Sequence, residues 1–194
     1  MDWLVSLGKE YINATMRFYS RYPSNTARKN WQEKRDQVQR TLEEHQQNID
    51  RHIAQAQSSY DFHFLTDLHF SSVNVANSAH KLLNDAKEHL AGINDLLIGS
   101  KEQRATLQAT LESARANKDK VLIHETIEQL KMLNELRKNV FEEKEKIKQE
   151  KDQLFAKLKE LNCRTSELKE LIKTHCGSKG RDWYNKRLEA RRNH

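Results

Sequence analysis

The chain of 194 residues contains a single proline, five glycines and two cysteines, and only 7% of its residues are aromatic. Residues 26–91 and 100–176 contain neither glycine nor proline. Because these two residues are the strongest breakers of regular structure, their absence over such lengths favours long, uninterrupted helices. With 36% hydrophobic and 32% charged residues, the chain is too poor in large apolar side chains for one compact core. We therefore expect an extended helical protein with narrow apolar seams.

Long apolar runs are also missing. No run approaches the roughly 18 residues that a membrane-spanning helix needs, and the first residues lack the basic and apolar regions of a secretory signal. Cys163 and Cys176 fall on one expected helix, where a rise of ~1.5 Å per residue separates them by about 20 Å. A disulfide requires Cα atoms within about 7 Å, so the two cannot pair with each other. A reducing, cytoplasmic location is the expectation.

The clearest pattern that is present is a strict seven-residue repeat in the second long segment. Its members are Leu133, Val140, Ile147, Leu154, Leu161 and Leu168. Such a repeat keeps one edge of a helix facing a partner when the helices supercoil around each other. The companion positions are mixed: Leu130, Leu158 and Ile172 are apolar, whereas Arg137, Lys144, Lys151 and Thr165 are polar. We expect an all-α fold built on a long antiparallel helical hairpin, a coiled coil.

The positions of proline and glycine predict three parts of the chain. Residues 1–22 form an amphipathic N-terminal helix, and Pro23 ends it. Residues 26–176 form the hairpin, with its turn near 99–100, where Gly99 fits a helix C-cap and Ser100 the start of a capping box with Gln103. Residues 117–119 are a weaker candidate for this turn. Residues 177–194 form a basic tail. Gly177 and Gly180 give it a flexible connection to the hairpin, and a short helix is expected from Asp182.

The two ends of the chain carry the excess of positive charge. The net charge is +6 overall, with +4 in residues 1–35, +4 in residues 177–194 and −2 between them. Basic ends can bind phosphate, acidic lipid headgroups or an acidic protein surface. The alternative is that their charge only keeps a long helical protein in solution. The candidates for phosphate contact in the tail are Lys179, Arg181, Lys186, Arg187, Arg191 and Arg192.

Residues 60–70 concentrate aromatic and histidine side chains. Thr66-Asp67-Leu68-His69-Phe70 resembles the first metal motif of metallophosphoesterases, but neither Gly-Asp nor Gly-Asn-His follows, and no sheet is expected around it. We therefore expect no metal, no cofactor and no catalytic residue. The segment fits packing against the N-terminal helix or a neighbouring protomer, or docking of a different protein, because an exposed aromatic patch invites association.

Function is expected to reside in contacts with other macromolecules rather than in small-molecule chemistry. The favoured hypothesis is a non-enzymatic coiled-coil scaffold or adaptor that binds a protein partner or itself. The alternatives are a nucleic-acid-associated protein that uses the basic ends and a peripheral membrane protein anchored through residues 2–22. Aromatic residues outside the repeat are the candidates for partner docking: Trp3, Tyr11, Phe18, Phe62, Phe64, Phe70, Trp183 and Tyr184.

Overall fold

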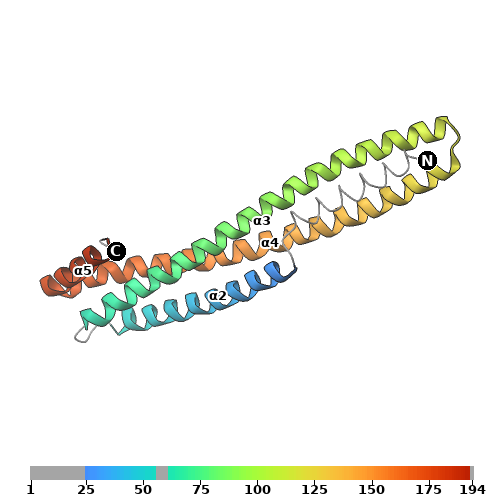
Figure 1. The fold of residues 1–194 in the computed structure, drawn as a ribbon. Helices are drawn as coiled ribbons and strands as arrows, with labels where there is room; N and C mark the ends of the chain where they lie inside the picture. The colour runs from blue at the N-terminus through green and yellow to red at the C-terminus, as the bar shows by residue number, and fades with distance from the viewer. Residues whose placement is uncertain (1–24, 56–60, 193–194) are drawn as a thin grey trace. The chain divides into compact units, whose positions relative to one another are not determined.

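The computed structural model describes residues 25–55 and 61–192, and within these residues the chain is helical with no strand (Figure 1). The helices, in order, are α2 (Asn25–Ala54), α3 (Phe62–Ala116), α4 (Lys120–His175) and α5 (Gly177–Arg192). The predicted all-α class and the hairpin of two long helices are confirmed. The helix expected over residues 1–22, with Trp3, Tyr11 and Phe18, lies outside the described residues.

The chain divides into two compact units. Among the described residues, unit 1 contains residues 25–28 and 85–150, and unit 2 contains residues 29–55, 61–84 and 151–192. Each unit therefore holds one stretch of α3 and one stretch of α4. In unit 1 these stretches are antiparallel neighbours, because the turn between α3 and α4 joins them directly.

The hairpin turn lies at residues 117–119, so the prediction of a turn near 99–100 is wrong. Lys118 adopts a left-handed φ of 56°, and its amide donates to the Arg115 carbonyl at 3.1 Å. The Asp119 amide donates to the Ala114 carbonyl at 3.0 Å. These two bonds form a Schellman motif, which commonly ends a helix. The Asp119 carboxylate then accepts the Leu122 amide at 3.1 Å and caps α4.

Helix α3 runs through Gly99 and Ser100 because neither residue breaks it. A Cβ added at Gly99 would meet nothing within 4 Å, and Gly99 does not have the positive φ found at Gly177. The Ser100 hydroxyl donates to the Leu97 carbonyl, one turn earlier, at 2.8 Å. The apparent capping box is thus the interior of a helix, in which serine bonds back to its own backbone.

All six residues of the seven-residue repeat are buried. Their exposed fractions range from 5% at Leu133 to 0% at Ile147, Leu154, Leu161 and Leu168. Two of the polar companion positions, Arg137 and Thr165, form hydrogen bonds across the hairpin or within α4. Arg137 donates to the Leu97 carbonyl at 3.1 Å and to the Ser100 hydroxyl at 2.6 Å, within unit 1. In unit 2 the buried Thr165 hydroxyl donates to the Leu161 carbonyl at 2.8 Å.

In unit 2, helix α2 packs against both α3 and α4. Leu42 and Ile49, seven residues apart, are buried, and the indole of Trp31 donates to the Leu82 carbonyl of α3 at 3.1 Å. Toward α4, Glu43 pairs with Lys157 and Asp50 pairs with Arg164, each at 2.9 Å. Unit 2 is therefore a three-helix arrangement to which α5 is added.

A part-buried hydrogen bond joins α2 to α3. His45 Nδ1 lies 3.0 Å from the Ser72 hydroxyl, which itself donates to the Leu68 carbonyl at 2.8 Å. Because the single hydroxyl proton is used on the carbonyl, the hydroxyl oxygen must accept from His45, so Nδ1 carries the proton. Burial lowers the pKa of His45, which favours the neutral ring.

In unit 1, the start of α2 is held by charge. The Arg28 guanidinium, with 11% of its side chain exposed, contacts Glu143 at 2.6 Å and also Glu150, seven residues further along α4. Burial lowers the pKa of Arg28, but the hydrogen bonds and charges of the two carboxylates raise it more, and the net direction is upward. The guanidinium thus stays charged within a pair of acidic side chains.

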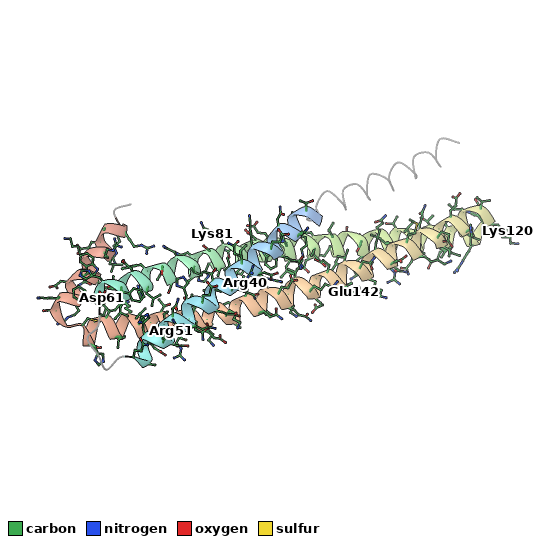
Figure 2. All side chains as sticks on the ribbon, turned by 90° about the horizontal axis from the view of Figure 1, so that it is seen from below. Arg40, Arg51, Asp61, Lys81, Lys120 and Glu142 are labelled. Carbon is green, nitrogen blue, oxygen red and sulfur yellow. The ribbon has the colours of Figure 1, made fainter. Side chains whose placement is uncertain are left out.

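Charged side chains cover the outside of the helices, as Arg40, Arg51, Lys81 and Glu142 illustrate in Figure 2. Among residues 25–55 and 61–192, no helix carries a stretch long and apolar enough to cross a bilayer.

The location of the turn predicts that removing a glycine stabilises the chain at position 99 and that introducing one stabilises it at position 118. Gly99→Ala should raise the free energy of unfolding by about 0.5–1 kcal/mol, since alanine suits a helix interior and meets no steric obstacle. Lys118→Gly should raise it by a similar ~1 kcal/mol, because glycine adopts a left-handed φ without strain. Urea unfolding measures both variants. Destabilisation by Gly99→Ala would contradict the continuity of α3.

The buried repeat predicts a steep contrast between adjacent residues of α4. Leu161→Asp should lower the free energy of unfolding by about 3–5 kcal/mol, because it buries an unpaired charge at a position with 0% exposure. Asn162→Asp, at the exposed next position, should change it by less than about 0.5 kcal/mol. Thermal unfolding followed by circular dichroism distinguishes the two. Equal losses would contradict the burial of the repeat.

Candidate interaction surfaces

A very short turn joins α4 to α5. Cys176 is the one residue between them, and Gly177 has a φ of +69°. The Gly180 amide donates to the Cys176 carbonyl at 3.3 Å, and a Cβ on Gly180 would lie 2.3 Å from Cys176 Cβ and 3.5 Å from Phe62 Cβ. The two glycines therefore build a tight turn instead of loosening a tail. The tail is helical from Gly177 rather than from Asp182.

Aromatic residues of α5 pack against the first turns of α3. Tyr184, with 3% of its surface exposed, stacks on Phe70 at a centroid distance of 5.3 Å and meets the edge of His69 at 5.2 Å. Trp183 meets His63 edge-on at 4.2 Å. The docking candidates Phe70 and Tyr184 are thus buried against each other within one chain, which removes them from the surface available to a partner.

Two arginines of α5 bind groups of α3. Arg187 contacts Asp67 at 2.7 Å. Arg191 donates to the Phe70 carbonyl at 3.3 Å, contacts the Asn74 side chain, and places its guanidinium 4.9 Å from the centre of the Phe70 ring. These two phosphate candidates are engaged within the chain. The other four remain exposed on the outside of α5: Lys179, Arg181, Lys186 and Arg192.

The remaining aromatic candidates differ in exposure. Phe62 of α3 and Trp183 of α5 are half-buried, while Phe64 is 48% exposed and packs beside His52 of α2 at 4.7 Å. We refer below to the residues of α3 that contact α5 as the α5-docking face: Phe62, His63, Asp67, His69, Phe70 and Asn74.

The buried histidine of this face is held neutral. His69 Nε2 lies 3.5 Å from the Tyr184 hydroxyl, and its Nδ1 has no hydrogen-bond partner among the described residues. Burial, with the positive charges of Lys169, Arg191 and Lys173, lowers the pKa of His69 to about 4. Burial likewise raises the pKa of Tyr184, with a further contribution from Glu170.

The structure separates the residues of the metal-like motif. Asp67 is exposed and bound to Arg187, while His69 is buried against Tyr184. Within the described part of the chain, no group of three or more histidine, cysteine, aspartate and glutamate side chains is placed to hold a metal ion.

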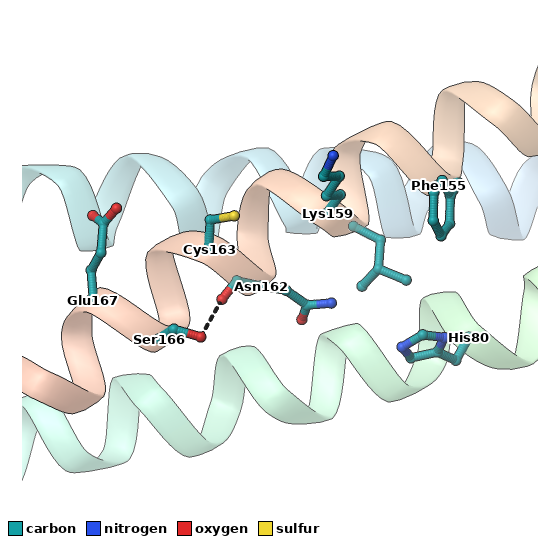
Figure 3. Close-up of a pocket in the computed structure, with 8 residues that line it drawn as sticks. His80, Phe155, Lys159, Asn162, Cys163, Ser166 and Glu167 are labelled. Carbon is teal, nitrogen blue, oxygen red and sulfur yellow. Dashed lines mark hydrogen bonds between the residues drawn. The ribbon is translucent and has the colours of Figure 1, made fainter.

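A second surface is a groove of about 500 Å³ between α3 and α4 in unit 2 (Figure 3). Leu158, which is 1% exposed, and Phe155, which is 55% exposed, supply its apolar lining. The remaining lining residues are polar: His80, Lys159, Asn162, Cys163, Ser166 and Glu167. The Ser166 hydroxyl donates to the Asn162 carbonyl at 2.9 Å, so it is already satisfied within α4.

The groove opens on the side of α4 that α2 leaves uncovered. Lys157 and Arg164 mark the α4 face turned toward α2, because they pair with Glu43 and Asp50. Phe155 and Lys159 flank Lys157 two residues away on either side, and two residues correspond to about 200° around a helix. The groove therefore faces away from α2. We term this surface the α3–α4 groove.

The sequence prediction missed this groove. Phe155 immediately follows Leu154 of the repeat and lies outside the seam, and an aromatic residue off the apolar stripe was the available signal. No sequence pattern brings His80 to the same place, because the contact depends on the register between α3 and α4.

Comparisons with protein-family models, with curated proteins and with solved structures find no match for this chain.

The neutral His69 predicts a pH dependence of stability. Its pKa is about 4 in the folded chain and about 6.5 when unfolded, so between these values the unfolded chain binds more protons. The contribution of His69 to stability should therefore be constant above about pH 7 and fall by an amount on the order of 3 kcal/mol as the pH drops from 6.5 to 4. Urea unfolding at a series of pH values measures this loss.

The control for this prediction is His69→Phe, which keeps an aromatic ring against Tyr184 and removes the titration. His45 titrates in the same direction in both proteins, so the comparison isolates His69. The difference in stability between the two proteins should change across pH 4–6.5. Parallel pH curves would contradict the buried neutral state of His69.

Proposed function

We propose that this chain is a non-enzymatic, cytoplasmic coiled-coil scaffold or adaptor that acts through protein–protein contacts. The observation that carries the proposal is the α3–α4 groove, where Phe155 stands 55% exposed over the buried Leu158. A large aromatic side chain at the mouth of an apolar groove is the kind of residue that dominates the energy of protein interfaces.

The groove has the geometry that a helical partner requires. Two antiparallel helices present a channel parallel to their axes, and a third helix laid into it would complete a four-helix arrangement together with α2. Phe155, Asn162 and Ser166 line this channel at spacings of seven and four along α4. Such spacings match successive turns of a helix laid alongside.

Charges of both signs rim the groove. Lys159 and Glu167 lie eight residues, or about two turns, apart on α4. A partner helix with an acidic residue and a basic residue two turns apart would pair with both in one orientation only. Rim charges of this kind select the partner and the direction of docking more than they add affinity.

Phosphate binding by α5 is the second candidate. It is supported by the four exposed basic residues Lys179, Arg181, Lys186 and Arg192. The same helix exposes Asp182 and Glu189, which offset half of that charge. The membrane alternative depends on residues 2–22, which are outside the described residues.

The native Cys163 at the groove permits a direct test of the proposal. A thiol-reactive photo-crosslinker is attached to Cys163 in the Cys176→Ala chain, a change that retains the Cβ packed near Gly180. The probe should capture a discrete protein in native cell extract, and Phe155→Ala should abolish the capture. Digestion with nuclease should leave the adduct unchanged.

The matched control moves the thiol to α2, on the far side of unit 2 from the groove. Gln47→Cys, in the chain with Cys163→Ala and Cys176→Ala, carries the probe on the exposed face of α2, about 200° around the helix from the buried Ile49. Equal capture from positions 47 and 163, or capture unaffected by Phe155→Ala, would overturn the proposal.

A further inference from the structure

We propose that α5 is an exchangeable arm: the α5-docking face that holds it within one chain also accepts α5 from a second copy of the same chain. The two copies would then form a closed, two-fold symmetric dimer in which each α5 occupies the other copy's α3. The inference is independent of the proposed function, because it concerns α5 and α3 and not the α3–α4 groove.

The connection between α4 and α5 suits such an exchange. Cys176 alone separates the two helices, and the positive φ of Gly177, the first residue of α5, creates the reversal. Glycine populates left-handed and right-handed conformations at similar cost. A change of Gly177 to a helical φ would join α4 and α5 into one helix over residues 120–192. The arm would then point away from its own docking face.

The docking contacts are specific enough to be rebuilt between copies. Along α5, Trp183, Arg187 and Arg191 meet His63, Asp67 and Asn74, so α5 runs beside α3 in the same direction. All these contacts join residues 62–74 to α5, so a second copy supplies the identical set. Exchange therefore restores these contacts between α3 and α5, and both docking faces are filled.

The docked arm is also held less firmly than a permanent core. Within α5, Gly180 and Tyr184 are the buried residues, and the Arg187–Asp67 pair has both side chains about half exposed. An exposed ion pair contributes little to stability. Two buried nitrogens of this interface, His69 Nδ1 and Trp183 Nε1, have no hydrogen-bond partner among the described residues, which penalises the docked state.

The first experiment uses the hinge. Gly177→Ala penalises the left-handed turn and favours the continuous helix, so it should raise the dimerisation constant by about tenfold or more over the unaltered chain. Sedimentation equilibrium of the full-length chain measures this constant. The control is Gly99→Ala, the same substitution inside α3, which should leave the constant unchanged.

The second experiment identifies the exchanged contact by reversing its charges. Asp67→Arg and Arg187→Asp are made separately in full-length Gly177→Ala chains. Each variant alone opposes like charges both within a copy and between identical copies. When the two are mixed, each α5 meets an opposite charge on the other variant. Native mass spectrometry should then show the mixed dimer in several-fold excess over the statistical share.

The double variant Asp67→Arg/Arg187→Asp restores the pair within each copy and should return the dimerisation constant to that of the Gly177→Ala parent. The charge variants are also mixed in the unaltered Gly177 background at high concentration, so the test does not depend on how Gly177→Ala folds. A Gly177→Ala chain that stays monomeric, or mixed dimers at the statistical share in both backgrounds, would overturn the inference. Phe155→Ala should affect neither experiment.

Discussion

Burial of one edge of α4 is the constraint on which the rest of the structure depends. Leu133, Val140 and Ile147 in unit 1, and Leu154, Leu161 and Leu168 in unit 2, have at most 5% of their surface exposed. The other buried side chains, such as Leu42 and Ile49 of α2 in unit 2, lie where further helix faces pack against one another. A polar residue that reaches this buried layer must find its partner there.

The polar groups beside the seam meet this requirement through long-range bonds. Arg137 bonds to Leu97 and Ser100 of α3, and His45 of α2 bonds to Ser72 of α3. Apolar contacts along a regular repeat tolerate a shift by one heptad, whereas each of these bonds has a partner at one position only. Polar groups in helical seams are known to fix register in this way, often at a cost in stability. We infer the same role for Arg137 and His45.

The sequence predicted what depends on periodicity and failed where conformation depends on distant neighbours. The seven-residue repeat located the buried edge of α4. The turn was misplaced because Lys118 occupies the left-handed position that glycine usually takes, while Gly99 lies in a helix. Nothing local to either residue distinguishes the two cases.

The surface between α3 and α5 likewise depends partly on local sequence and partly on distant neighbours. The sequence predicted that the segment of residues 60–70 packs against the N-terminal helix or a neighbouring protomer, or docks a different protein. In the structure, His63, His69 and Phe70 instead contact α5, which the sequence predicted to stand apart. The tight turn before α5 requires the absence of a Cβ at Gly180, because that atom would lie 2.3 Å from Cys176 Cβ. A glycine that permits close packing and a glycine in a linker look alike in a sequence.

Counting charges is therefore a poor guide to the charge that α5 offers a ligand. The six basic residues of the tail are not equivalent: Arg187 and Arg191 are bound to Asp67, Phe70 and Asn74, and their positions on α5 are fixed by the stacking of Tyr184 on Phe70. The remaining four share the exposed surface of α5 with Asp182 and Glu189. Arginine suits the contacts with Asp67, Phe70 and Asn74, because its planar guanidinium can donate several hydrogen bonds and stack on an aromatic ring at the same time. The arginines at 187 and 191 are thus explained by the fold of unit 2, and a ligand for the basic tail need account only for Lys179, Arg181, Lys186 and Arg192.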